Sequence, residues 1–281
     1  MLCLFQARLQ SLATSLILML KRETLRIVLI TFAVLAVIVI NALIISRPTP
    51  DIIDAPIATR SAAKVPDFSA YTNVDEKKAA FFDYLRPEVI KQNNYLLTLR
   101  HYVQTLYRQV LNKQPLNAND RERLQWLTQE YRVDDSQTIT LQLLSLLKKI
   151  DVVPIDLVLV QAANESAWGT SRFAKQGFNF YGLWCFSEGC GFVPSRRQPG
   201  LTHEVAKFDN VSKATYTYMR NLNRHEAYSE LREIRSRLRA NQIPINGVAL
   251  AEGLMNYSER GAAYVEELQN MIRYNEEYLS E

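Results

Sequence analysis

The chain has 281 residues, of which 48% are hydrophobic, and a formal net charge of +4. This length holds one large domain or two small ones, with a core that needs no covalent staples. Residues 1–47 contain five basic residues and one acidic residue, so residues 48–281 carry 28 of each and are neutral. The basic excess therefore belongs to the N-terminal flank and does not indicate a nucleic-acid-binding protein.

An apolar segment near the N-terminus predicts a membrane anchor. Residues 27–46 contain no charged side chain, and a helix of this length spans a bilayer. A cleaved signal peptide is the alternative, but the run is longer than a usual signal-peptide core and no small-x-small site follows it. We therefore expect a cytoplasmic leader at 1–26 and an uncleaved transmembrane anchor at 27–46.

The flanking charges predict the orientation of this anchor. Arg8, Lys21, Arg22 and Arg26 precede it, against the single acid Glu23. Positively charged flanks stay in the cytoplasm. The chain is thus expected to cross the inner membrane once, with its main domain in the periplasm.

Residues 47–74 contain four prolines among small and polar residues, which is typical of an extended linker. Residues 75–150 are predicted to be helical, because apolar side chains recur every three or four positions. A first helix ends before Pro115, a second runs from about residue 119 to 131, and a third covers 138–150. Six aromatic side chains of this region are expected in the core: Phe81, Phe82, Tyr84, Tyr95, Tyr102 and Trp126.

The most informative segment is an apolar run between Pro154 and Gly169. Proline is tolerated at a helix start and glycine follows a helix end, so we expect a mostly buried helix that presents Glu165 at its C-terminal end. The negative end of the helix dipole and an apolar environment both raise the pKa of a carboxyl group. A carboxylic acid still protonated near neutral pH is what a general acid requires. The alternative is a Glu on a solvated helix face, which the adjoining Trp168 disfavours.

Residues 183–208 are richer in Gly, Pro and aromatic side chains, and 201–208 alternates weakly, which predicts a small β-hairpin. Cys185 and Cys190 flank a short turn, and outside the cytoplasm such a pair favours a disulfide. A metal pair is the alternative, but none of the three histidines has ligand spacing to these cysteines. We therefore expect a structural disulfide and no metal. Helices are expected to resume at Ser212 and to end with 263–279.

Four motifs in order carry a family resemblance. They read QAANESAWG at 161–169, NFYG at 179–182, FDNVS at 208–212 and NYSERGAAY at 256–264. This order resembles glycoside hydrolase family 73, the bacterial β-N-acetylglucosaminidases of the lysozyme-like superfamily. Within that family, the helical stretch 79–92 and the cysteine-bearing insert are similar to the Bax-like bacterial proteins.

The resemblance implies a mainly α, lysozyme-like helical domain with a small β-hairpin. Residues 75–150 would form its helical N-terminal part and residues 151–281 the glucosaminidase catalytic core. It also implies a peptidoglycan hydrolase that cleaves the β-1,4 bond after N-acetylglucosamine. Its partner would be the peptidoglycan glycan strands, and no cofactor would be needed.

The resemblance assigns the general acid to Glu165, and glycosidases usually pair this acid with a second carboxylate. Glu204, Glu188 and Asp209 are the candidates. Glu204 is favoured because family members place an acid on the hairpin that faces the cleft. The alternative is that the substrate's own N-acetyl group acts as the nucleophile, and the hydroxyl of Tyr257 is then expected to orient this group.

Five further residues are expected on the substrate side: Trp168, Asn179, Tyr181, Gly182 and Tyr264. The rings of Trp168 and Tyr181 offer apolar faces on which sugars stack. Trp168 is equally expected as a buried wall of the site, and Tyr264 is expected to pack.

Two alternatives to a glucosaminidase stay open at this level. One is a catalytically inactive glycan-binding or scaffold protein on the same fold, which the Glu-Ser-x-Trp-Gly context of Glu165 disfavours. The other is a muramidase or a lytic transglycosylase, which cuts the neighbouring linkage.

The membrane topology predicts a protease result. Protease added to intact spheroplasts should digest residues 48–281, because the apolar run and its basic flank leave this part outside the cytoplasm. Immunoblotting of the membrane fraction measures this. Digestion only after lysis would contradict the orientation, and release of the domain as a soluble periplasmic protein would identify the run as a cleaved signal.

Overall fold

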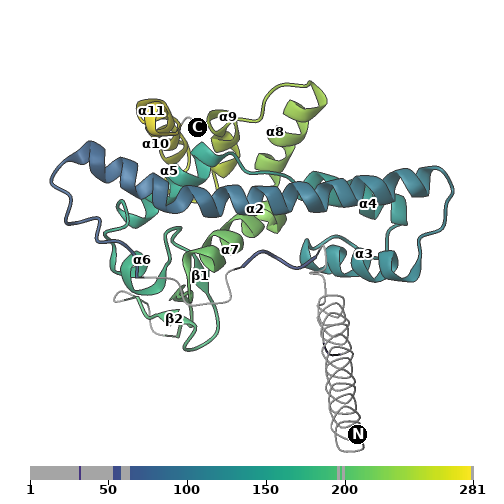
Figure 1. The fold of residues 1–281 in the computed structure, drawn as a ribbon, viewed down its shortest axis with the longest axis horizontal. Coiled ribbons are helices and arrows are strands. Elements are labelled where there is room, and N and C mark those ends of the chain that lie inside the picture. The colour runs from purple at the N-terminus through teal and green to yellow at the C-terminus, as the bar shows by residue number, and fades with distance from the viewer. Residues whose placement is uncertain (1–31, 33–52, 58–63, 195–196, 198–199, 280–281) are drawn as a thin grey trace, which may run out of the picture. The chain divides into compact units, whose positions relative to one another are not determined.

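The computed structural model of the protein describes residues 32, 53–57, 64–194, 197 and 200–279. Nearly all the regular structure in these residues is helical (Figure 1). Its elements in chain order are α2 (Val74–Leu111), α3 (Ala118–Glu130), α4 (Ile139–Lys149), α5 (Ile155–Ser166), α6 (Arg172–Gly177), β1 (Trp184–Cys185), β2 (Gly191–Phe192), β3 (Glu204–Ala206), α7 (Val211–Arg224), η1 (Glu226–Tyr228), α8 (Ser229–Ala240), α9 (Gly247–Ala251), η2 (Glu252–Leu254), α10 (Ala262–Tyr274) and α11 (Glu276–Leu279).

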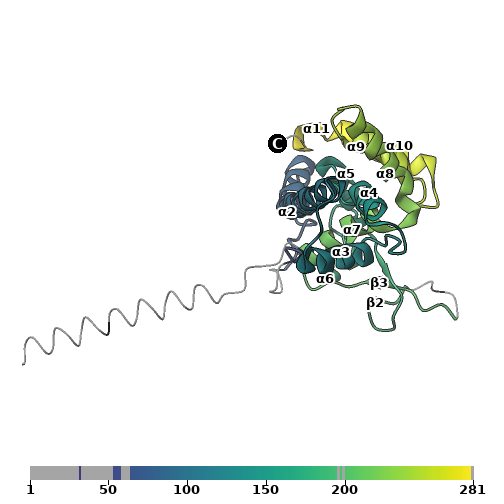
Figure 2. The same cartoon turned by 90° about the vertical axis from the view of Figure 1, so that its right-hand side faces the viewer.

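Helix α5 is the centre of the domain and confirms the helix predicted between Pro154 and Gly169. Pro154 is its N-cap residue, and every side chain from Leu157 to Ala163 is fully buried. A helix that is apolar on all sides is stable only when other elements enclose it. Helices α2, α9 and α10 pack against it. In both views α9, α10 and α11 lie on one side of α5, and α6 with the short strands lies on the other (Figures 1 and 2).

The N-terminal end of α5 is fixed by a buried guanidinium. Arg235 of α8 is 1% exposed and donates to the main-chain oxygens of Lys148, Lys149, Asp151 and Val152. It thereby satisfies carbonyl groups at the end of α4 and in the connection to α5. Removing one partner of such a buried charged network typically costs about 3–5 kcal/mol.

The packed domain starts earlier than the predicted boundary at residue 75. Phe68, inside the segment predicted as a linker, is fully buried, and the hydroxyl of Tyr95 donates to the main-chain oxygen of Ile53 at 2.8 Å. Helix α2 then begins at the N-cap Asn73, whose side chain accepts from the N–H groups of Asp75 and Glu76. The proline-rich composition correctly indicates a segment without regular structure. It does not reveal that Phe68 of this segment packs against α2.

The other predicted helices are confirmed within a residue or two, with one exception. Helices α3 and α4 begin at the N-caps Asn117 and Thr138. The predicted last helix, 263–279, is split into α10 and α11 at Asn275. The side chain of Asn275 donates to the main-chain oxygen of Met271 at 2.7 Å, which ends α10 by satisfying one of its terminal carbonyls.

The predicted hairpin is a three-stranded antiparallel sheet with the order β1-β3-β2. A disulfide joins Cys185 and Cys190, as the sequence predicts. The ring of Phe192 in β2 packs against Phe173 of α6 with centroids 5.7 Å apart. This contact fixes the sheet to the helical body.

Among the described residues, no helix is long and apolar enough to span a membrane. The predicted anchor at 27–46 lies outside the described residues apart from Phe32.

Candidate active site

The chain turns sharply directly after Glu165. Three successive residues, Ala167, Trp168 and Gly169, have positive φ angles of 50°, 58° and 73°. For residues with a Cβ atom this conformation costs about 1–2 kcal/mol each. The hydroxyl of Ser166 offsets part of the cost, because it accepts from the N–H of Gly169 at 2.8 Å and donates to the main-chain oxygen of Ala162 at 2.6 Å.

Packing of Trp168 against α2 also stabilises this left-handed turn. The ring of Trp168 lies 5.6 Å from that of Phe81 and 5.3 Å from that of Phe82, centroid to centroid. A Cβ atom at Gly169 would lie 2.4 Å from Phe68, so only glycine fits there. The Ser, Trp and Gly of the motif therefore build the turn that holds Glu165 in place.

A chain of hydrogen bonds leads to the Glu165 carboxyl group. The hydroxyl of Tyr218 donates to Oε1 of Gln161. Nε2 of Gln161 then donates to the hydroxyl oxygen of Tyr264 at 3.0 Å, and the Tyr264 hydroxyl donates to Oε1 of Glu165 at 2.7 Å. Tyr218, Gln161 and Tyr264 are all buried. Water therefore does not compete for these bonds, and the whole chain points toward Glu165.

This direction fixes which oxygen of Glu165 carries a proton. Because Gln161 donates to Tyr264, the hydroxyl proton of Tyr264 must go to Oε1 of Glu165. The acidic proton is left for Oε2. Gly182 lies beside this oxygen: it is exposed, and a Cβ atom placed on it would be 3.1 Å from Oε2. The missing side chain leaves room next to the proton-bearing oxygen.

A folded loop brings Gly182 to this place. Nδ2 of the buried Asn179 donates to the main-chain oxygens of Leu183 and Ala206, and its Oδ1 accepts from the N–H of Leu183. The ring of Tyr181 is fully buried and stacks on Tyr218, with centroids 4.1 Å apart. Asn179 and Tyr181 thus hold the loop from below, while Gly182 faces outward.

Burial dominates the electrostatics of Glu165. Loss of solvent raises the pKa of this carboxyl above its usual value, and the nearby charge of Glu267 raises it further. The Tyr264 hydrogen bond and the charge of Arg260 act in the opposite direction. Arg260 is also paired with Glu267 at 2.6 Å. The net effect favours the protonated form that a general acid needs.

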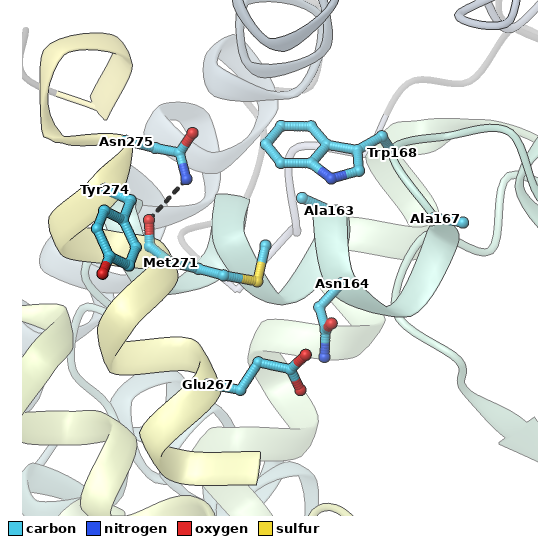
Figure 3. A pocket seen from close by; sticks show the side chains of 8 residues that line it. All are labelled: Ala163, Asn164, Ala167, Trp168, Glu267, Met271, Tyr274 and Asn275. Atoms are coloured by element: carbon cyan, nitrogen blue, oxygen red, sulfur yellow. Dashed lines mark hydrogen bonds between the residues drawn. The ribbon is translucent and has the colours of Figure 1, made fainter. Parts of the chain in front are cut away.

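A cavity of about 430 Å³ lies between the C-terminal end of α5 and helix α10, and Glu165 is not among the residues that line it (Figure 3). Asn164 and Trp168 line it on one side, and Glu267, Met271 and Tyr274 line it on the other. A hollow of about 420 Å³ continues past Arg260. The larger cavity of about 640 Å³ includes Pro154 and lies at the opposite end of α5. Ten residues of helix, about 15 Å, separate that end from Glu165.

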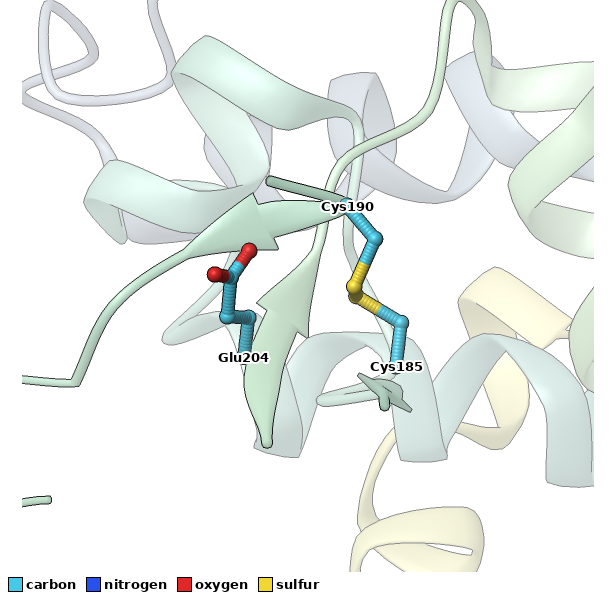
Figure 4. A group of neighbouring side chains, drawn as sticks. All are labelled: Cys185, Cys190 and Glu204. Carbon is cyan, nitrogen blue, oxygen red and sulfur yellow. A yellow bond between two sulfur atoms is a disulfide. The ribbon is translucent and has the colours of Figure 1, made fainter. Parts of the chain in front are cut away.

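Glu204 is held by its own hairpin. It is 3% exposed, and its two oxygens accept from the N–H groups of Gly189 at 3.0 Å and Gly191 at 2.7 Å. These bonds lower the pKa of its carboxyl. Among the described residues, one group of three possible metal ligands has its ligand atoms close together. It consists of Cys185, Cys190 and Glu204 (Figure 4). The disulfide already takes both sulfurs and the hairpin takes the carboxylate, so the cluster does not offer free ligands.

The structure brings Glu165, Trp168, Gly182 and Tyr264 together, but it distributes the tyrosine roles differently from the sequence interpretation. The hydroxyl on Glu165 belongs to Tyr264, which was expected to pack. The hydroxyl of Tyr257 donates to the main-chain oxygen of Tyr181 at 2.6 Å, and its ring stacks on that of Tyr264. Orientation of a substrate group by Tyr257 stays a prediction.

The residues predicted to contact sugar or to act on it have different surroundings in the structure. Trp168 lines the cavity between α5 and α10. The ring of Tyr181 is enclosed by protein and presents no free face to a sugar in this arrangement. Its stacking on a sugar stays a prediction. No hydrogen bond or ion pair among the described residues links Glu204 to Glu165, and its catalytic role also stays a prediction.

Sequence reasoning did not assign roles to Gln161, Tyr218 and Glu267. For two of them, the sequence spacing from a predicted site residue could have indicated a role. Gln161 stands four residues before Glu165 and Glu267 three residues after Tyr264, which are spacings that share one helix face. Tyr218 is brought to Gln161 only by the packing of α7, which local spacing does not encode.

Residues 142–277 match the family model described as "Glucosaminidase: Mannosyl-glycoprotein endo-beta-N-acetylglucosaminidase". The chain is also similar to Protein bax of Escherichia coli (strain K12), with 28% identity over 229 residues, which is 79% of each chain. Residues 142–277 therefore resemble a glucosaminidase domain, and the chain as a whole is similar to a Bax protein. No solved structure matches it.

The match to a glucosaminidase domain supports a glycosidase-type enzyme that binds glycans. The matched segment includes α5, the Asn179–Gly182 loop, the hairpin and α10. The matched segment therefore contains Glu165 with Tyr264 and Gly182, which lie beside its carboxyl group. The preceding helix α2 lies outside it and supplies the aromatic rings behind Trp168.

Replacing Tyr264 with Phe tests the hydrogen bond on Glu165. The bond lowers the pKa of Glu165, so its loss should raise that pKa further. A general acid works while protonated, and activity falls as pH rises through its pKa. The basic limb of the pH–kcat profile should therefore move to higher pH in Tyr264→Phe.

Tyr257→Phe is the matched control for this change. Its hydroxyl bonds to a main-chain oxygen, so the basic limb should not move. Tyr264→Phe should also lower the free energy of unfolding by about 1–3 kcal/mol, because Nε2 of buried Gln161 loses its acceptor. A basic limb that stays at the same pH or moves to lower pH in Tyr264→Phe would contradict the site as described.

Proposed function

We propose that this chain is a peptidoglycan hydrolase that cleaves the β-1,4 bond after N-acetylglucosamine, with Glu165 as general acid. One observation carries the proposal: the half-buried carboxyl of Glu165 has one oxygen bonded to Tyr264 and the other beside the open position at Gly182. The glucosaminidase match supports N-acetylglucosamine as the sugar on one side of the bond. The predicted anchor at 27–46 would place the domain in the periplasm, where peptidoglycan lies.

In the proposed reaction, Oε2 of Glu165 gives its proton to the glycosidic oxygen. The bond between this oxygen and the anomeric carbon breaks, and positive charge develops on the sugar ring. The carboxylate that forms still accepts the Tyr264 hydrogen bond on Oε1, so its charge is stabilised without movement of the side chain. The chain from Tyr218 to Tyr264 is in place before the reaction, which avoids a reorganisation cost.

Glu165→Gln tests the general acid. The substitution keeps the volume of the side chain and removes the proton donor, so turnover should fall by on the order of 10²–10⁴-fold. Turbidity loss of purified peptidoglycan measures the rate, and circular dichroism checks that the fold is kept. Peptidoglycan clearing close to the parent rate would reject the assignment.

Mass spectrometry of the parent enzyme's muropeptides identifies the bond. A reducing-end N-acetylglucosamine supports the proposed specificity. A reducing-end or anhydro muramic acid would instead identify a muramidase or a lytic transglycosylase. Glycan binding without any product would favour the inactive scaffold.

The second catalytic group has two candidates. Glu204 is the predicted carboxylate, but both of its oxygens accept from the hairpin N–H groups. A direct role would require these bonds to break. We therefore favour the acetamido group of the substrate as nucleophile, which needs no second carboxylate nearby, and a positioning role for Glu204.

Glu204→Gln separates these roles. An amide offers one acceptor oxygen, so one of the two glycine N–H groups loses its partner and the loop loosens. A positioning role predicts a higher KM with kcat kept within about tenfold, well short of the ~10²–10⁴-fold that a catalytic group contributes. Glu188→Gln, an exposed acid of the same loop, is the control. A severe loss of kcat in Glu204→Gln alone would return Glu204 to the catalytic set.

A further inference from the structure

Two large aromatic side chains on the hairpin face solvent. Trp184 is 51% exposed and Phe186 is 76% exposed. Trp184 begins β1, and Phe186 directly follows this strand, so the two rings are neighbours on one short segment. Exposed apolar area that gathers in one place marks a binding surface more often than it occurs by chance.

The segment that carries these rings is held from three directions. Cys185, between the two rings, is bonded to Cys190. Glu204 accepts from the N–H groups on both sides of Cys190. The ring of His203 meets that of Trp184 edge-on, with centroids 4.8 Å apart. A backbone and a Trp184 ring that are already held lose little conformational entropy when a ligand binds.

The segment also starts at the candidate active site. Gly182 lies beside Oε2 of Glu165, and Trp184 begins β1 two residues later. At no more than about 3.6 Å of chain per residue, Trp184 lies within about 7 Å and Phe186 within about 14 Å of Gly182. Both rings are therefore within reach of a short oligosaccharide that occupies the position beside Glu165.

We propose that Trp184 and Phe186 are sugar-stacking subsites that bind the glycan strand beyond the bond to be cut. This rests on the proposed function. Aromatic rings offer flat apolar faces that match the C–H faces of pyranose rings. The disulfide and Glu204 serve as positioning elements for this platform.

A membrane surface is the competing partner for exposed aromatic rings. The charges of the loop disfavour it, because the exposed carboxylate of Glu188 lies two residues from Phe186. Anionic headgroups repel such a carboxylate and attract basic residues instead. Continuity with Glu165 favours the glycan.

The test measures binding of N-acetylglucosamine oligomers of increasing length to the detergent-solubilised full chain carrying Glu165→Gln. Affinity should rise with length. Trp184→Ala and Phe186→Ala should each lower the affinity for long oligomers by on the order of tenfold, as expected for one lost apolar contact of ring size, and leave the shortest unchanged. Trp184→Phe and Phe186→Tyr keep a ring and should restore most of the affinity. Tyr71→Ala, at a 39% exposed aromatic residue ahead of α2, should change nothing.

Three outcomes would overturn the proposal in distinguishable ways. If the Glu165→Gln parent binds no oligomer of any length, the proposed function fails together with the platform. If it binds and the alanine variants keep the full gain with length, only the platform fails. The third outcome uses the full chain reconstituted in vesicles of phosphatidylethanolamine and phosphatidylglycerol with brominated acyl chains. Quenching that Trp184→Phe abolishes, with no fluorescence response to oligomers, would assign the rings to the membrane.

Discussion

The candidate site depends on one chain of hydrogen bonds that the core encloses. Tyr218 donates to Gln161, Gln161 to Tyr264, and Tyr264 to Glu165. Each donor has one direction available, so the arrangement determines both the position of the carboxyl group and the oxygen that holds its proton. A polar network of this kind is stable only when every member is satisfied. The burial of α5 by α2, α9 and α10 meets this condition by keeping water away.

Two parts of the fold support the site around Glu165: the turn that follows this residue and the hairpin. The left-handed turn after Glu165 is held by Ser166 and by the packing of Trp168 on α2, so it fixes the carboxyl group itself. The hairpin is a second unit, stapled by the Cys185–Cys190 disulfide and by Glu204. It extends from Gly182 and determines what lies next to the acid.

The sequence predicted what local rules control. Pro154 and Gly169 marked the ends of α5, Thr138 marked the start of α4, and the cysteine spacing indicated the disulfide. Roles that depend on contacts distant in sequence were harder. The ring of Tyr181 follows a loop motif, yet it turns inward because Tyr218 of α7 offers it a stacking partner. Tyr257 and Tyr264 are equivalent by composition, and only the position of α10 against α5 decides which hydroxyl reaches Glu165.

The pKa of Glu165 is raised because burial outweighs the Tyr264 hydrogen bond and the charge of Arg260. Infrared difference spectroscopy measures this directly. The carboxyl band of the parent protein is followed against pH, and the Glu165→Gln variant identifies its source. The raised pKa predicts a band that is lost in the variant and that titrates above the usual range for a glutamate. A Glu165 band that titrates at or below that range would contradict it.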